Sequence, residues 1–350
     1  MKLAVLSDTH AGVRGDAVSF ADHQDEFYKE QFFPYCKEHG ITTILHGGDF
    51  FDRRQFVTLK TMQRLRSTFC KLIKEGDYEL HLIVGNHDVL YRNTNDVNSP
   101  DVLFHGYDKV HVYKDPTVVH DVMLVPWINK ENYASTLAAM NETSAKFVLG
   151  HFEIAGFEMH RGAVAESGLD AELFNRFHTV MSGHFHTRSS SGNITYLGAP
   201  FEMTWSDYND PKGFHIFDTE TGQLDFIQNT VSMFFRCEYD TVENVRSWTP
   251  YKPTLLTDKY VKIIVKNKGS AYEFDKWIKE ITAYGPADIQ IIESAIDITG
   301  VELSLEELEQ KSKSNLDIVK DYVYNLQVDD AKKAKVYDYM QTLYSEVNTL

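Results

Sequence analysis

The sequence predicts a mixed α/β protein whose main body is a two-sheet β-sandwich flanked by helices. Apolar runs of strand length alternate with amphipathic helical segments in the first part of the chain. Short strand and hairpin signals follow, which indicate a change to antiparallel pairing. After about residue 230 the pattern changes to a small αβ segment and then to helical periodicity. The sandwich is therefore expected to carry a small capping domain and C-terminal helices.

The first part reads as a β-α-β-α-β unit. Strands are expected over 2–7, 41–46 and 79–84, and helices over about 21–39 and 58–74, each helix ending before a glycine. The crossovers of such a unit are right-handed. Short strands then follow over 110–113, 117–120, 122–126, 146–149, 179–182, 194–197, 213–218 and 224–228, with a helix near 130–140 and a loop over 93–100.

Three domains are expected, with boundaries near residues 230 and 300. They are a catalytic domain over 1–230, a capping domain over 231–300 and a helical region over 301–350. The capping domain should contain strands over 259–265 and 289–293 around a helix over 272–282, with Trp277 in its core. In the last region Ser304 and Glu307 are expected to form a capping box at the start of a helix. A later helix should present an apolar stripe that packs either within this chain or against a partner, at Val336, Met340, Leu343 and Val347.

The composition is that of an ordinary globular chain with 43% hydrophobic and 25% charged residues. A net charge of −16 argues against non-specific binding of polyanions, although bound divalent cations would supply local positive charge for a phosphate substrate. No apolar run approaches the roughly 18 residues of a membrane span, and no secretory signal is evident. The three cysteines lack a CxxC pair, so buried free thiols in a reducing, cytoplasmic compartment are expected.

Five short polar islands carry the chemistry, and each follows an expected strand. They are Asp8-Thr9-His10, Gly47-Gly48-Asp49-Phe50-Phe51-Asp52, Gly85-Asn86-His87-Asp88, Gly150-His151 and Gly183-His184-Phe185-His186. Polar groups just past the carboxyl ends of parallel strands converge on one crevice. Each island alone is compatible with a turn or a solvated pair, but the ordered set indicates a metal site.

The inventory suits two divalent ions that activate a phosphate ester. Asp8 and His10 leave a strand at alternate positions and can reach one ion, and His186 would return to it. Asn86, His151 and His184 would hold the other ion, with Asp49 as the bridging carboxylate. Mixed oxygen and imidazole ligands suit manganese or iron and tolerate zinc.

His87 is expected to act on the substrate rather than on a metal, because it is adjacent to Asn86. It would stabilise the transition state or protonate the leaving alkoxide. Asp52 or Asp88 could orient an imidazole from behind.

Basic and aromatic residues near the islands have two interpretations each. Arg14, Arg53, Arg54 and Arg92 could contact DNA phosphates or be solvated, and Arg53–Arg54 is the better pair. Tyr91 could stack on a base or pack. Met203, Trp205 and Tyr208 line a substrate cleft or are buried in the core.

The islands DTH, GDFFD, GNHD, GH and GHFH, in this order, resemble the signatures of calcineurin-like metallophosphoesterases. Asp8-Thr9-His10-Ala11-Gly12, Tyr196-Leu197-Gly198-Ala199-Pro200 and Lys212-Gly213-Phe214 are similar to the SbcD branch, and most similar to the nuclease subunits of T-even-like phages. The resemblance extends from Met1 to about residue 230.

The resemblance implies a metallophosphoesterase fold and a Mn²⁺-dependent nuclease of DNA repair and recombination. It would be a double-strand exonuclease and single-strand endonuclease, acting on DNA ends as a homodimer with an SbcC-type coiled-coil ATPase in the bacterial host cytoplasm. The family's metal ligands fall on the seven residues assigned above, with His87 as the catalytic histidine. The family's ATPase-binding helices would correspond to 304–350.

Two alternatives use the same sequence features. One is a small-substrate phosphodiesterase or phosphatase on the same dinuclear scaffold, which the metal site alone does not distinguish. The other is a non-catalytic protein that keeps the fold only.

Overall fold

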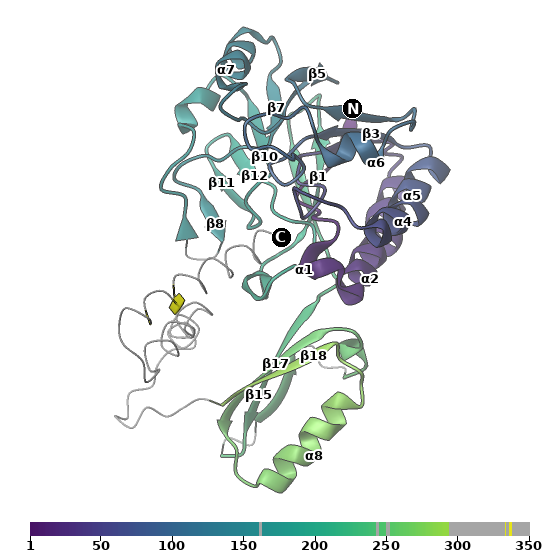
Figure 1. Ribbon diagram of the computed structural model, residues 1–350, viewed down its shortest axis with the longest axis vertical. Helices are drawn as coiled ribbons and strands as arrows, with labels where there is room; N and C mark the ends of the chain where they lie inside the picture. Colours follow the sequence, from purple (N-terminus) through teal and green to yellow (C-terminus); the bar gives the residue numbers. More distant parts are fainter. Residues whose placement is uncertain (161–162, 243–244, 250–252, 294–332, 334–335, 338–350) are drawn as a thin grey trace. The chain divides into compact units, whose positions relative to one another are not determined.

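The computed structural model describes residues 1–160, 163–242, 245–249, 253–293, 333 and 336–337 (Figure 1). Tertiary contacts divide the chain into two compact units, Met1–Ile292 and Glu293–Leu350. Most of the second unit lies outside the described residues, and with it the capping box, the apolar stripe and the helices expected over 301–350. The expected domain boundaries at 230 and 300 therefore stay predictions.

The first sheet has six strands in the order β14-β13-β1-β2-β3-β4. Strands β1, β2 and β3 are parallel to one another, as predicted. Strand β4 is also parallel to β3, so the change to antiparallel pairing expected from residue 110 does not occur there. Strands β13 and β14 add to β1 in antiparallel fashion. The strands are β1 (Lys2–Leu6), β2 (Thr43–His46), β3 (Glu79–Ile83), β4 (Val110–Tyr113), β13 (Gly213–Asp218) and β14 (Leu224–Gln228).

The second sheet also has six strands, in the order β11-β12-β10-β7-β6-β5. Its four central strands are parallel, and both edge strands pair antiparallel. The strands are β5 (Thr117–Val119), β6 (Val122–Val125), β7 (Phe147–Gly150), β10 (Thr179–Ser182), β11 (Ser189–Ser191) and β12 (Ile194–Tyr196). A separate hairpin of β8 (Glu158–His160) and β9 (Ala163–Val164) was not predicted from the sequence.

Alternate residues of the strands fill two different cores. In β1, Leu3 and Val5 pack between the two sheets, in one cluster with Leu124 and Leu149 of the second sheet. Ala4 and Leu6 point to the other face and pack with the helices. This alternation confirms the predicted two-sheet sandwich, because a central strand such as β1 is buried on both faces.

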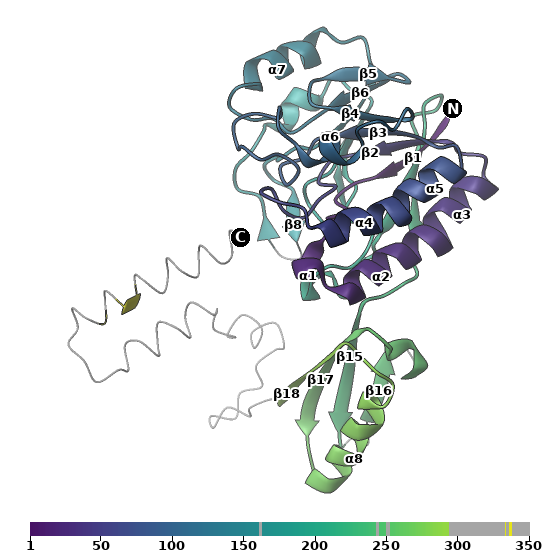
Figure 2. The same ribbon diagram turned by 45° about the vertical axis from the view of Figure 1, so that its right-hand side comes forward.

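Helices cover the outer faces of the sandwich (Figures 1 and 2). Aromatic residues of α2 and α5 join the core on the outer face of the first sheet, and Met140 of α7 packs on the second. The helices are α1 (Val13–Asp16), α2 (Val18–Phe27), η1 (Tyr28–Phe32), α3 (Phe33–Glu38), α4 (Leu59–Ser67), α5 (Phe69–Glu75), α6 (Ser99–Leu103), α7 (Tyr133–Glu142), η2 (Ala171–Phe174) and η3 (Trp205–Asp207).

Three of these helical segments differ from the sequence prediction. The helix expected over 21–39 contains a π-helical turn, η1, between α2 and α3. The helix expected over 58–74 is interrupted at Thr68, whose φ of −117° and ψ of −84° end α4 before α5 begins. The end of the expected loop over 93–100 starts α6, which Asn98 caps with its side chain.

The segment after residue 233 has its own hydrophobic core. Its sheet has the order β16-β15-β17-β18, and α8 packs on it (Figure 2). Phe274, Trp277 and Ile281 of α8 pack against strand residues such as Cys237 and Ile263, which confirms Trp277 as a core residue. The elements are β15 (Phe234–Asp240), β16 (Val245–Thr249), η4 (Pro253–Leu256), β17 (Tyr260–Asn267), α8 (Ala271–Thr282) and β18 (Asp288–Glu293). The sequence prediction lacked β15 and β16.

The cysteine and membrane expectations can also be compared with the structure. Cys36, Cys70 and Cys237 are buried and free, as predicted. Burial raises the pKa of the Cys36 and Cys237 thiols to about 12, so both stay protonated. Among the described residues, no helix combines the length and apolarity that a membrane span requires.

Candidate metal centre

The five polar islands follow β1, β2, β3, β7 and β10 and converge at the carboxyl ends of these strands. The chain turns sharply where it leaves the strands. Asp8, Asp49 and His184 have φ angles of 53°, 52° and 87°, a left-handed conformation that non-glycine residues rarely adopt. Such backbone strain is kept where the surrounding structure fixes it, which is typical of binding and catalytic sites.

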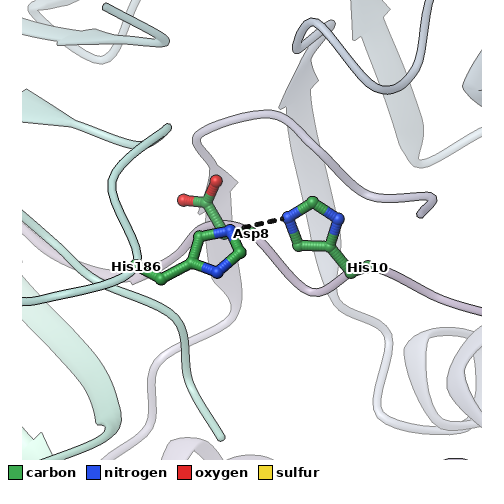
Figure 3. Close-up of side chains that lie close together, drawn as sticks. All are labelled: Asp8, His10 and His186. Atoms are coloured by element: carbon green, nitrogen blue, oxygen red, sulfur yellow. Dashed lines mark hydrogen bonds between the residues drawn. The ribbon is translucent and has the colours of Figure 1, made fainter. Parts of the chain in front are cut away.

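A first donor group consists of Asp8, His10 and His186, whose ligand atoms lie within 4.8 Å of one another (Figure 3). The Nε2 atoms of His10 and His186 face each other at 3.0 Å. Burial, together with the charge of His186, lowers the pKa of His10 well below its usual value, and burial lowers that of His186 to about 4. Both imidazoles are therefore neutral at pH 7, and at most one of the facing nitrogens carries a hydrogen.

A second donor group consists of Asp49, His151 and His184. Asn86 lies between the two imidazoles, because its Oδ1 is 2.9 Å from His151 Nε2 and 2.9 Å from His184 Nδ1. His151 donates its Nδ1 hydrogen to the carbonyl oxygen of Gly47 at 2.8 Å, which directs Nε2 into the group. A hydrogen bond of this kind fixes the tautomer of a metal-binding histidine.

One oxygen of Asp49 faces both groups. Asp49 Oδ2 is 3.3 Å from His151 Nε2 and 3.9 Å from His10 Nε2. The other oxygen, Oδ1, accepts a hydrogen bond from the backbone N–H of His87 at 2.7 Å. This position is the one that a bridging carboxylate between two ions requires.

The electrostatics of the centre favour a bound cation. Burial alone would lower the pKa of His151, but the carboxylates of Asp49 and Asp8 raise it to about 9. Burial and then the charge of Asp49 raise the pKa of Asp8 to about 7, since the two carboxylates repel each other. A positive charge placed among these oxygens relieves the repulsion. The oxygen and imidazole donors fit two divalent ions of the manganese, iron or zinc type.

Two glycines are required for the islands to approach each other. A Cβ on Gly85 would lie 2.2 Å from the backbone nitrogen of Asp49 and 2.3 Å from its Oδ1. Gly48 has a φ of +92°, and a Cβ there would lie 2.7 Å from His151 Nδ1. Any larger residue at these two positions would displace the Asp49 carboxylate or the His151 imidazole.

The two carboxylates expected to orient an imidazole have different partners in the structure. Asp52 Oδ1 lies 3.6 Å from His10 Nδ1, which has no hydrogen-bond partner among the described residues. Asp88, in contrast, contacts backbone, and its carboxylate accepts from the N–H groups of Phe50, Phe51 and Gly85 at 3.2, 2.9 and 2.9 Å. The expectation that Asp88 orients an imidazole is therefore corrected. It holds together the two loops that carry Asp49 and Asn86.

His87 is partly exposed, while the donors Asp8, His10, Asp49, Asn86 and His151 are buried. Its Nδ1 lies 2.7 Å from the carbonyl oxygen of Asp52, so Nδ1 carries the hydrogen and Nε2 is free to meet a substrate. Its ring centroid lies 5.0 Å from that of His10. His87 is thus next to the metal donors without belonging to either group.

The four arginines differ in their partners. Arg14 donates from Nε to the carbonyl oxygen of Met203, and Arg53 lies 3.6 Å from the Asp16 carboxylate and 5.0 Å from the centre of the Phe56 ring. Burial and the neighbouring charge of Arg92 lower the pKa of the Arg54 guanidinium. Arg92 therefore lies near enough for its charge to act on Arg54, and the interpretation of Arg53 and Arg54 as a DNA-binding pair stays a prediction.

The structure also shows how deeply Met203 and the aromatic candidates are buried. Met203 is 1% exposed and belongs to the core, as the burial alternative predicted. Trp205 and Tyr208 pack against that core, and the rings of Trp205 and Phe234 lie 4.7 Å apart with a tilt of 46°. Tyr91 is 54% exposed.

Sequence reasoning missed several supporting residues. Lys212 Nζ donates to the carbonyl oxygen of His186 at 2.7 Å and contacts the carboxylates of Asp207 and Asp210 at 2.8 and 2.7 Å. The side chain of Gln24 donates to the carbonyl oxygen of Thr9 at 3.0 Å, just before His10. Neither residue lies in an island, so only the family-like run that begins at Lys212 gave a sequence signal.

The fold and the site define a metal-dependent phosphoesterase. Residues 1–188 match the family model described as calcineurin-like phosphoesterase, and the chain belongs to this family. Across 99% of both chains it is 32% identical to exonuclease subunit 1 of Enterobacteria phage T4. It is also 24% identical to a subunit of the nuclease SbcCD of Staphylococcus saprophyticus, over 64% of this chain and 67% of that protein. A solved archaeal phosphodiesterase matches with a TM-score of 0.33 and 13% identity, over 65% of this chain and 100% of that one, and carries no weight here.

Proposed function

We propose that this chain is a manganese-dependent DNA nuclease subunit that hydrolyses phosphodiester bonds by a two-metal mechanism. It would act as an exonuclease on double-strand ends and as an endonuclease on single strands. The observation that carries the proposal is the position of Asp49 Oδ2 between two donor groups, 3.3 Å from His151 Nε2 and 3.9 Å from His10 Nε2. The full-length similarity to a phage exonuclease subunit supports DNA as the substrate.

Seven residues would hold the metals. One ion would bind to Asp8, His10 and His186, the other to Asn86, His151 and His184, and Asp49 would bind to both. Two such ions supply Lewis-acid activation of the phosphate and of the attacking water. The protein contributes the fixed positions, because Gly47 orients His151 and Asp8 accepts the backbone N–H of His184 at 3.0 Å.

In its imidazolium form, His87 would supply from Nε2 the proton or the hydrogen bond that the leaving oxygen needs. Its Nδ1 hydrogen is engaged by the carbonyl oxygen of Asp52, and its backbone N–H by Asp49. Both contacts fix the position of the His87 ring beside the donor groups. A positioned imidazole of this kind typically contributes about 10²–10⁴-fold to the rate.

Arg54 and Arg92 would bind the phosphate backbone of DNA. Two cations held close together repel each other, and an anionic phosphate between them removes that repulsion. Arg14 and Arg53 have partners within the chain and are the weaker candidates.

The proposed assembly is a homodimer with an SbcC-type coiled-coil ATPase in DNA double-strand-break repair and recombination. The net charge of −16 disfavours DNA binding by the chain alone, so a partner would be needed for affinity. One relative is named as a subunit of the SbcCD nuclease, which supports the partnership. The partner would bind to the region 304–350, in the cytoplasm of the bacterial host.

The test is degradation of end-labelled linear duplex DNA in Mn²⁺, with and without a co-expressed ATPase partner. Manganese-dependent degradation that the partner enhances is expected. If a small phosphodiester is hydrolysed while duplex and single-stranded DNA stay intact under both conditions, the chain is a small-substrate phosphodiesterase. The acidic surface favours that second candidate, because it repels a polyanion.

A further inference from the structure

A cluster of two histidines and a glutamate lies on strands β3 and β4, away from the Asp49 centre. Glu79 is the first residue of β3, and the island Gly85-Asn86-His87-Asp88 follows the opposite end of this strand. Strand β3 is five residues long, so its two ends lie about 13 Å apart at roughly 3.3 Å per residue. The cluster therefore shares no residue with the Asp49 centre.

Strand geometry places the three side chains on one face. His81 and His111 are direct partners in the parallel β3–β4 pair. Glu79 precedes His81 by two residues and so points to the same side of the sheet. The two imidazole rings stack with centroids 5.0 Å apart and an interplanar angle of 20°.

The three ligand atoms converge. Glu79 Oε1 lies 3.1 Å from His111 Nε2 and 3.6 Å from His81 Nε2, and all three atoms lie within 4.8 Å of one another. Ligands of a tetrahedral zinc with bonds of about 2.0–2.1 Å are separated by about 3.3 Å. The distance from Glu79 to His111 is slightly shorter than this ligand separation, at 3.1 Å, and the distance from Glu79 to His81 is slightly longer, at 3.6 Å.

A buried nitrogen without a partner points into the cluster. His81 is 4% exposed, and its Nε2 has no hydrogen-bond partner among the described residues. Its other nitrogen, Nδ1, lies 2.9 Å from the hydroxyl of Tyr113. When Nδ1 donates to this oxygen, the lone pair of Nε2 is directed at Glu79, as a metal-binding histidine requires.

We infer that Glu79, His81 and His111 form a binding site for a borderline transition-metal cation such as zinc. Two imidazoles and one carboxylate are the ligands that zinc uses in three-ligand sites, with a fourth position left for water. The side chains of Glu79 and His111 are 41% and 39% exposed, which gives the ion a path from solvent. A bound ion would tie β4, the edge strand of the first sheet, to β3.

The test counts zinc ions on the full-length protein by titration against a chromophoric chelator. Wild type is expected to bind one zinc ion more per chain than His111→Gln. His120→Gln is the matched control, because His120 is exposed and its ring centroid lies 5.6 Å from that of His81 but outside the three ligands. It should keep the wild-type count. Tyr113→Phe should keep the site but weaken it by roughly 10–100-fold.

Unchanged Mn²⁺-dependent hydrolysis of a model phosphodiester by His111→Gln shows that the variant is folded. If His111→Gln does not fold, Glu79→Gln takes its place. In thermal unfolding, zinc should stabilise wild type more than it stabilises the ligand variant. Equal zinc counts in wild type and in the ligand variant would overturn the inference, and the cluster would then be a hydrogen-bonded histidine pair. The result does not depend on the DNA nuclease proposal.

Discussion

His10 and His186 direct their Nε2 atoms at each other across 3.0 Å (Figure 3). The two residues are 176 positions apart in the sequence, and each ring is neutral at pH 7 because burial disfavours its protonated form. Two neutral nitrogens at this distance share a single hydrogen at most, and the carboxylate of Asp8 lies in the same donor group. A divalent cation satisfies both nitrogens and the carboxylate at once.

Adding Mn²⁺ should therefore stabilise the protein. Binding that is specific to the folded state contributes about 2.7 kcal/mol per site when the free ion exceeds its Kd 100-fold. We expect the unfolding temperature to rise by several degrees in Mn²⁺ and to fall again with a chelator. His10→Gln should lose part of this shift. An unfolding temperature that does not respond to Mn²⁺ would refute the metal centre.

Replacing His87 by Gln should slow phosphodiester hydrolysis by about 10²–10⁴-fold in kcat. The metal donors are separate from the His87 side chain, so Mn²⁺ binding measured by calorimetry should be unchanged. His105→Gln, at an exposed position, is the matched control and should behave as wild type. Full activity in His87→Gln would exclude it as the proton donor.

Replacing Arg54 or Arg92 by Gln should weaken DNA binding without changing the turnover of a small phosphodiester. Each lost phosphate contact should reduce the slope of log K against log salt by about 1. Arg66→Gln on α4 is a control with an exposed arginine. If the salt slopes of all three variants equal that of wild type, neither arginine binds the DNA backbone.

Asp88→Ala should destabilise the fold and weaken metal binding together. The substitution leaves the N–H groups of Phe50, Phe51 and Gly85 without their acceptor, and each costs about 1–3 kcal/mol. We expect at least about 3 kcal/mol less free energy of unfolding in urea. Asp115→Ala, at an exposed position, should cost less than about 0.5 kcal/mol. A neutral Asp88→Ala would show that the two loops hold without this carboxylate.

Because Lys212 and Asp207 form a buried ion pair, the free energy of unfolding should decrease at acidic pH. Burial alone would raise the pKa of Asp207, but Lys212 and two backbone N–H groups lower it below the ordinary 3.8. The ionised Asp207 carboxylate therefore stabilises the folded state fully above about pH 5. This stabilisation is lost as the pH falls below 3.8 toward the pKa of Asp207 in the folded state.

Lys212→Met leaves Asp207 buried without its cation and should cost about 3–5 kcal/mol at pH 7. Its stability should fall less steeply in acid than that of wild type. Lys71→Met, whose side chain is 61% exposed, serves as control. A variant with the same acid profile as wild type would show that Lys212 does not set the pKa of Asp207.

The sequence predicted the parts of this protein that periodicity and strand ends determine. Strand β1 alternates between two cores, and the islands after β1, β2, β3, β7 and β10 come together as expected. The ends of the strands can be predicted because a polar group that directly follows a buried apolar strand lies at the edge of the sheet.

Other features depend on contacts between distant segments and have no period in the sequence. Asp88 resembles a residue that orients an imidazole, yet its neighbours in space are three backbone N–H groups. The charge of Arg92 acts on Arg54 although 38 positions separate the two residues in the sequence. Strand β15 does have the alternation of a half-buried strand, with Cys237 and Tyr239 buried between charged residues, and the sequence prediction overlooked it.

The most direct test of the dinuclear centre is electron paramagnetic resonance of the protein titrated with Mn²⁺. If Asp49 bridges two ions, their spins are coupled, and the spectrum of the loaded protein should show a multiline exchange-coupled signal that Asp49→Asn abolishes. A six-line spectrum of isolated Mn²⁺ at every ratio of metal to protein would contradict the bridged centre.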